Sequence, residues 1–94
     1  MPSGRASAVA VAFNQKVYVF GGETAPGMIS NSVECYDPAT QRWTALAPMP
    51  LNAHGMGAAV VHGAIYLMGG FTGPSDAVGS ESHALYRFVP VLQQ

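Results

Sequence analysis

The sequence predicts an all-β fold built from two successive copies of one structural unit. The segment KVYVFGG at 16–22 returns 48 positions later as AIYLMGG at 64–70. A Met-Pro pair recurs at the same spacing, at 1–2 and again at 49–50. An apolar strand that ends in a glycine pair, repeated every 40 to 50 residues or so, is typical of stacked or radial β architectures. In such folds no single unit buries its own faces.

Composition supports this fold class. Of the 94 residues, 49% are hydrophobic and 10% are charged, while 11 glycines and 7 prolines favour turns over long helices. A net charge of −1 offers no basic field for nucleic acid or anionic lipid. No apolar run reaches the roughly 18 residues that span a bilayer, and no signal segment opens the chain. We therefore expect a soluble domain without a nucleic-acid or membrane partner, its compartment left open.

The two inner strands of the first unit are predicted from their apolar residues. Residues 7–13 are continuously small and apolar, which suits an innermost strand buried on both faces. A short turn at 14–15 leads into a second strand at 16–20. That strand should end at Gly21 and Gly22, where backbone freedom lets the chain leave the sheet.

The two outer strands are separated by a turn with a clear sequence signature. Residues 32–36 alternate between the two faces of a third strand. In the turn at 37–40, the aspartate side chain caps the backbone and the proline sets φ. Residues 42–46 form the fourth strand, and the prolines at 48 and 50 prevent it from continuing.

The second unit repeats this order but ends early. Strands are expected at 57–61, 64–68 and 84–89, with a tight turn at 62–63 between the first two. The terminal segment 91–94 is too short and too polar to replace a fourth strand. The second unit should therefore have three strands.

The first unit closely resembles one complete kelch repeat. The resemblance rests on Met-Pro-x-x-Arg at 1–5, VYVFGG at 17–22, SVECYDP at 32–38, Trp43, and the second Met-Pro pair. The second unit keeps the tyrosine, the glycine pair and the final proline, whereas Phe-Val replaces the Tyr-Asp of the third strand. The resemblance implies blades of a β-propeller, which usually has six or seven.

It also implies the domain organisation. Residues 1–48 would form the first blade and residues 49–94 an incomplete second blade, both parts of one propeller domain. Aromatic residues at matching blade positions should pack between adjacent blades. The glycine pairs precede no helix, so they are expected to be turns rather than a phosphate cradle. The residues given a structural role are Gly21, Gly22, Tyr18, Tyr36, Trp43, Tyr66, Gly69, Gly70 and Phe88.

Alternating strand directions predict which end of the blades binds a ligand. The long loops 23–31 and 71–83 share one end with the segments that precede the innermost strands. The positions of Arg5 and Ser7 often line the central pocket in kelch proteins. An alternative role for Arg5 is to pair with a neighbouring carboxylate or carbonyl. The candidate ligand-binding residues are Arg5, Ser7, Asn52 and His54.

Neither a metal site, a cofactor nor a catalytic group is expected. His62 falls in a turn at the opposite end from His54 and His83. A kelch copper oxidase would need ligating tyrosine and histidine residues and a cysteine cross-linked to tyrosine. The single cysteine, Cys35, lies in mid-strand and excludes an intrachain disulfide. No nucleophile elbow is present, and the loop acids have no placed partner.

Three functions remain open. The leading one is a non-catalytic kelch module that presents its loops to a protein or carbohydrate partner. Apolar flanks would drive head-to-tail homo-oligomerisation, and three copies would give a six-blade ring. A second possibility is a fragment of a sugar-active propeller enzyme, similar to a mutarotase or epimerase, with its active groups in other blades. A third is a designed or minimal two-blade unit that self-assembles without any ligand.

Overall fold

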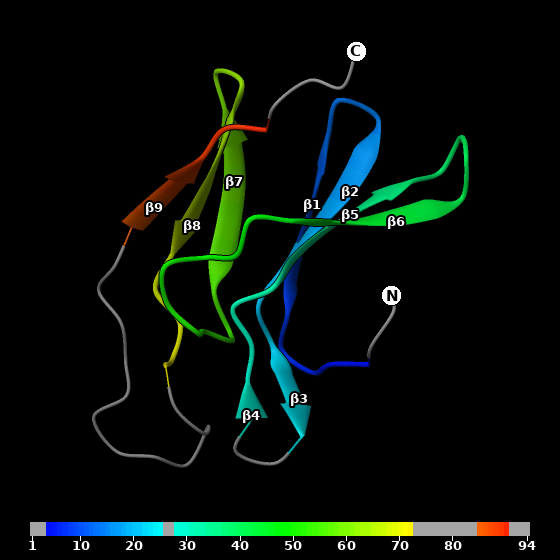
Figure 1. The fold of residues 1–94 in the computed structure, drawn as a ribbon. Helices are drawn as coiled ribbons and strands as arrows, with labels where there is room; N and C mark the ends of the chain where they lie inside the picture. The colour runs from blue at the N-terminus through cyan, green and yellow to red at the C-terminus, as the bar shows by residue number, and fades with distance from the viewer. Residues whose placement is uncertain (1–3, 26–27, 73–84, 91–94) are drawn as a thin grey trace.

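The computed structural model describes residues 4–25, 28–72 and 85–90. Within these ranges every regular element is a β-strand, and the strands form two larger antiparallel sheets and one small one (Figure 1). This architecture confirms the predicted all-β class. The two larger sheets correspond to the two sequence units.

The first sheet, called sheet 1, is a four-stranded meander in the order β1-β2-β5-β6. Its strands are β1 (Val9–Phe13), β2 (Lys16–Phe20), β5 (Val33–Asp37) and β6 (Arg42–Leu46). The predicted first strand began two residues earlier. Ser7 has a φ of 58°, and this left-handed backbone interrupts the extended conformation before Val9.

The second sheet, called sheet 2, has three described strands in the order β7-β8-β9. These are β7 (Gly57–Val61), β8 (Ala64–Met68) and β9 (Leu85–Phe88). The bounds of β7 and β8 agree with the sequence prediction. The predicted third strand also included residue 84, which lies outside the described residues, as does the terminal segment 91–94.

A small hairpin corrects the prediction that 23–31 is an irregular loop. Its strands are β3 (Glu23–Ala25) and β4 (Met28–Ile29). The Ser30 N–H donates to the Gly22 carbonyl over 2.8 Å, which closes the hairpin at its base. Strands of three and two residues are too short to show an alternating sequence pattern.

Tight turns connect the neighbouring strands at the end opposite this hairpin. Asn14 and Gln15 have φ values of 54° and 65°, so both central residues of the β1–β2 turn are left-handed. This is the turn geometry that matches strand twist. In the β5–β6 turn, the Ala39 N–H donates to the Asp37 carboxylate over 3.0 Å. Figure 1 shows these turns at the top and the β3–β4 hairpin at the bottom.

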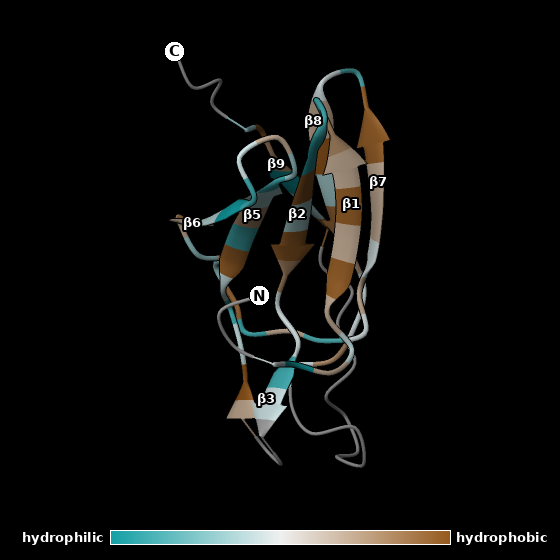
Figure 2. Ribbon diagram, turned by 90° about the vertical axis from the view of Figure 1, so that its right-hand side faces the viewer, coloured by the Kyte–Doolittle hydropathy of each residue, from teal (hydrophilic) through white to brown (hydrophobic). Residues whose placement is uncertain are grey.

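The core lies between the facing surfaces of sheet 1 and sheet 2. Phe20 and Ile65 are fully buried there, and Phe88 packs edge-on against Phe20 with ring centroids 5.4 Å apart. The innermost strands β1 and β7 lie side by side, and Figure 2 shows apolar residues along both. The buried core residues are Tyr18, Phe20, Val33, Cys35, Met49, Ala53, Ile65 and Leu67.

The expected burial of the innermost strand on both faces is not found. Val9, Val11 and Phe13 pack on the core, whereas Ala10 and Ala12 are exposed. Sheet 2 covers only one face of β1.

Two aromatic residues of the outer strands pack on each other instead of on sheet 2. Tyr36 and Trp43 are register partners, and their ring centroids are 4.9 Å apart. Both side chains are half-buried. They lie on the face of sheet 1 that points away from sheet 2, because Cys35 and Thr44 occupy the other face.

We expect Trp43→Ala to lower the free energy of unfolding by about 2 kcal/mol, because a half-buried ring loses less than the roughly 3–5 kcal/mol of a fully buried one. Thr44→Ala on the same strand should stay within about 0.5 kcal/mol of the unaltered chain. Urea unfolding at one protein concentration measures both. A double-mutant cycle with Tyr36→Ala should give a coupling of about 1 kcal/mol. Additive losses would show that the two rings do not interact.

Candidate functional site

The end of the molecule opposite the tight turns gathers four segments, which we call the loop end. Its described residues are 4–8, 21–25 with 28–32, 47–56 and 69–72. Ala6 and Glu23 exchange two backbone hydrogen bonds of 2.9 and 2.7 Å. His54 and Phe71, each 48 positions later, exchange the same pair over 2.9 and 2.8 Å. Each unit thus ties the segment before its first strand to the residue after its glycine pair.

Backbone hydrogen bonds also join the two units at the loop end. The Gly22 N–H donates to the Ala53 carbonyl over 2.9 Å, and the Gly55 N–H donates to the Ser7 carbonyl over 2.8 Å. The Ala53 N–H donates in turn to the carbonyl of Ser30, at the base of the hairpin, over 3.1 Å. The loop end is therefore a frame held by main-chain contacts.

The first glycine pair allows the two units to approach this closely. Gly21 has a φ of 65° and Gly22 a φ of 106°, both in the left-handed region. A Cβ atom on Gly21 would overlap the Ala53 carbonyl oxygen. The pair therefore both turns the chain and leaves room for the crossover between the units.

Arg5 is held inside the loop end by a carboxylate and a carbonyl. Its Nη2 lies 2.6 Å from the Glu34 Oε1, and its Nη1 donates to the Gly21 carbonyl over 3.1 Å. The two side chains of the ion pair are only 2% and 10% exposed. This is the alternative role that the sequence offered for Arg5. Its role as a ligand contact remains a prediction.

The other three candidate residues differ in their solvent exposure. Ser7 and Asn52 are exposed. His54 is 2% exposed, and its ring packs on Phe71 with centroids 5.7 Å apart. The structure thus places all four candidates at the loop end, with two at its surface and two in its interior.

The sequence analysis did not identify two apolar side chains that are exposed at the loop end. Met28 in β4 is 60% exposed and Leu51 in the crossover is 42% exposed. Hydrogen bonds from Met49 N–H to Asn31 and from Ala53 N–H to Ser30 tie their two segments together. The signal was present as apolar residues within predicted loops. Only the fold shows that they are exposed.

The two histidines in the described ranges lie at opposite ends of the molecule. His62 is exposed in the β7–β8 turn, at the opposite end from His54, and residue 83 lies outside the described ranges. Across the part of the chain that the structure describes, no three His, Cys, Asp or Glu residues could hold one metal ion. The same residues contain no helix suited to crossing a membrane. The loop acids at 76 and 81 also lie outside the described residues.

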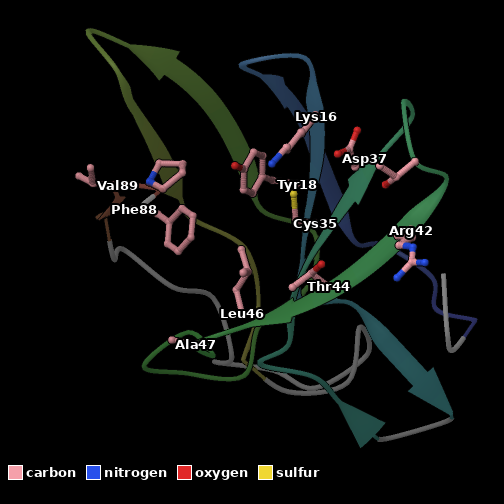
Figure 3. A pocket seen from close by; sticks show the side chains of 12 residues that line it. Lys16, Tyr18, Cys35, Asp37, Arg42, Thr44, Leu46, Ala47, Phe88 and Val89 are labelled. Atoms are coloured by element: carbon pink, nitrogen blue, oxygen red, sulfur yellow. The ribbon is translucent and has the colours of Figure 1, made fainter. Parts of the chain in front are cut away.

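A cavity, which we call the groove, opens between the outer strands of sheet 1 and β9. Its volume is about 500 Å³. Figure 3 shows side chains of β5 and β6 facing Phe88 and Val89 across it. The lining residues are Lys16, Tyr18, Cys35, Asp37, Thr40, Arg42, Thr44, Leu46, Ala47, Phe88, Val89 and Pro90.

Tyr18, which lines the groove, has a hydroxyl that is hard to ionise. Burial raises the pKa of the Tyr18 hydroxyl to about 12, because desolvation disfavours the phenolate. The nearby Cys35, which shares a side-chain hydrogen bond with this hydroxyl, raises the pKa further. The Tyr18 hydroxyl therefore keeps its proton to a higher pH than an exposed tyrosine does.

Sequence comparisons place the chain among known repeat proteins. The family model described as Kelch motif matches residues 4–50. The chain is 36% identical over 93 residues to beta-scruin of Limulus polyphemus. The match covers 97% of this chain and 10% of beta-scruin. It is 44% identical over 69 residues to Kelch-like protein 28 of Mus musculus, covering 66% of this chain and 12% of that protein.

A third relative gives the same picture. The chain is 36% identical over 84 residues to Kelch-like protein 23 of Homo sapiens, covering 89% of this chain and 13% of that protein. The chain therefore spans about a tenth of the length of the curated relatives it matches.

The close approach at Gly21 generates a stability prediction. Gly21→Ala should lower the free energy of unfolding by about 2–4 kcal/mol, since it adds a steric overlap to an unfavourable φ. Gly63→Ala is a matched control. Gly63 has a φ of 78° but no atom near its Cβ position, so about 1 kcal/mol is expected. Equal urea midpoints for the two variants would show that the crossover does not lie against Gly21.

Proposed function

The chain belongs to the kelch-repeat family, and we propose that it is a non-catalytic binding module whose loop end receives a protein partner. The observation that carries this proposal is the pair of exposed apolar side chains, Met28 and Leu51, on a hydrogen-bonded frame. Protein interfaces concentrate their binding energy in a few apolar anchors surrounded by polar residues. Exposed polar residues such as Asn52 supply such surroundings here.

The frame suits this role because it orders the anchors before binding. Main-chain hydrogen bonds hold the β3–β4 hairpin against the crossover, so the partner does not have to order these segments. A rigid scaffold that presents loops is a common arrangement for binding sites. The buried pair of Arg5 and Glu34 supports the scaffold from within.

We expect a peptide selected from a random library for binding to the chain to need the loop-end anchors. Met28→Asp and Leu51→Asp should each weaken it at least tenfold in a fluorescence-anisotropy titration, because an apolar contact is replaced by a charge. His62→Asp, an exposed substitution at the opposite end, is the matched control and should leave the affinity unchanged. If His62→Asp weakens binding while the other two do not, the binding end is assigned wrongly.

We also propose that the blades continue head to tail around a ring. The face of sheet 2 that points away from sheet 1 exposes Val61, Met68 and Leu85 at 47%, 42% and 65%. The corresponding outward face of sheet 1 exposes Ala10 and Ala12. Exposed apolar surface of this kind marks an interface.

The repeat also indicates which backbone groups would meet in that interface. Within the chain, the Gly22 N–H donates to the Ala53 carbonyl of the following unit. Gly70 stands 48 positions after Gly22, and Arg5 stands 48 positions before Ala53. In a head-to-tail contact, the Gly70 N–H of one copy would therefore donate to the Arg5 carbonyl of the next copy. Such a contact is head to tail, and three copies would close a ring of six blades.

Sedimentation equilibrium at micromolar concentration should give the mass of three chains. Leu85→Asp should shift the mass toward one chain, because it places a charge in the apolar interface. Met28→Asp, an equally exposed apolar position at the loop end, should leave the mass unchanged. A single-chain mass for the unaltered protein would contradict the ring.

A further inference from the structure

We propose that Met28 is a site of reversible oxidation, and that its conversion to methionine sulfoxide weakens the binding of a protein partner at the loop end. The oxidant is hydrogen peroxide. This inference rests on the proposed function of the loop end and adds a chemical control to it. The choice of Met28 as the oxidised residue depends only on where its sulfur lies in the fold.

The methionines of the loop end lie at different depths. Met28 is 60% exposed, Met56 is half-buried and Met49 is only 6% exposed. The terminal methyl carbons of Met49 and Met56 lie 3.1 and 3.0 Å from the position that a Cβ atom on Gly21 would take. Both side chains therefore pack beside the crossover between the units. A peroxide must reach a sulfur atom to react with it, so Met28 is the first to be oxidised.

The β3–β4 hairpin presents Met28 to solvent. Strand β4 consists of Met28 and Ile29, and neighbouring residues of a strand point to opposite faces. Ile29 is half-buried, whereas Met28 points away from the molecule. The Thr24 hydroxyl donates to the Met28 carbonyl over 3.3 Å, so the backbone of this residue is held from across the hairpin. No printed contact of the hairpin backbone uses the sulfur, and an oxygen added there leaves the hairpin in place.

Oxidation changes the chemistry of this side chain without adding a charge. The O–O bond of hydrogen peroxide breaks and an S–O bond forms, the thioether sulfur supplies two electrons, and water is the other product. The sulfoxide is polar, whereas the thioether is apolar. An apolar anchor gains its binding energy by leaving water, and a sulfoxide loses part of that gain because it must shed its hydration. Leu51 has no oxidisable atom, so we expect weakened binding rather than complete loss.

The change at Met28 can be reversed while the core stays intact. Methionine sulfoxide reductases A and B each act on one sulfoxide epimer. They release the oxygen as water while a dithiol reductant is oxidised to a disulfide. Oxidation of Met49 would instead place a polar group among the buried core residues. The difference in depth between Met28 and Met49 therefore separates a surface switch from damage to the core.

Mass-spectrometric peptide mapping of the full chain after timed peroxide treatment tests the site. We expect Met28 to be oxidised about tenfold faster than Met49, with Met56 between them, because the rate follows access to the sulfur. The urea midpoint of the chain oxidised at Met28 alone should equal that of the untreated chain. Equal rates at Met28 and Met49 would overturn the proposal.

A fluorescent peptide selected from a random library for binding to the full chain tests the effect on recognition. Oxidation of Met28 should weaken its binding by about fivefold in an anisotropy titration. Reductases A and B with dithiothreitol should restore the affinity, whereas dithiothreitol alone should not. This comparison excludes reversible oxidation of the buried Cys35, because a thiol reductant alone reverses a cysteine sulfenic acid or disulfide.

Two variants assign the effect to one sulfur atom. Met28→Leu removes that sulfur, so the affinity measured for this variant before peroxide treatment should be the same after it. Met68→Leu removes another exposed methionine, on the outward face of sheet 2, and this variant should still lose affinity on oxidation. An equal loss of affinity in Met28→Leu and in the unaltered chain would show that another residue is responsible.

Met28→Asp distinguishes failure of this inference from failure of the proposed function. If Met28→Asp weakens peptide binding but oxidation of Met28 does not, the loop end binds its partner and the oxidative control is wrong. If Met28→Asp leaves the affinity unchanged, the loop-end function fails and the oxidative control fails with it.

Discussion

The packing of sheet 1 against sheet 2 is the interaction on which the other features depend. Phe20 and Ile65 are fully buried and Leu67 is 2% exposed, each contributing roughly 1.5–3 kcal/mol by leaving water. A sheet with one apolar face is stable only when something covers that face. The two sheets meet along β1 and β7. The segments that precede these two strands are therefore brought together. Farther out the sheets are separated by the groove.

Main-chain hydrogen bonds and a buried ion pair both stabilise the loop end. At the loop end, main-chain hydrogen bonds hold the backbone in place. The exposed side chains of Met28 and Leu51 are not part of the buried core. Arg5 has the opposite role, because its charge is buried against Glu34. Removing one partner would leave an uncompensated buried charge, which is strongly destabilising. The arginine of the repeat motif is thus paired inside the scaffold, whereas Met28 and Leu51 are exposed.

The sequence predicted most strands because their signals are local. The apolar runs, the glycine pairs and the turn at 37–40 each depend on neighbouring residues only, and the 48-residue period shows that the same local pattern occurs twice. The β3–β4 hairpin has no such signal, since its strands are three and two residues long. The partner of Arg5 lies 29 positions away and is found only once β5 is in place. The exposure of Met28 and the burial of His54 are likewise consequences of tertiary packing.

Among the described residues, sheet 1 has four strands and sheet 2 has three. At the outer strand of sheet 1, Thr44 is exposed and Leu46 is half-buried, and both line the groove.

One aromatic residue connects this open region to the core. Phe88 lines the groove and contacts both Tyr18 and Phe20, at centroid distances of 6.1 and 5.4 Å. Phe20 in turn directly precedes the glycine pair of the loop end. Phe88 therefore joins the lining of the groove to the strand that leads into the loop end. Because β2 spans only about 16 Å, the two surfaces are separate in space yet share one strand.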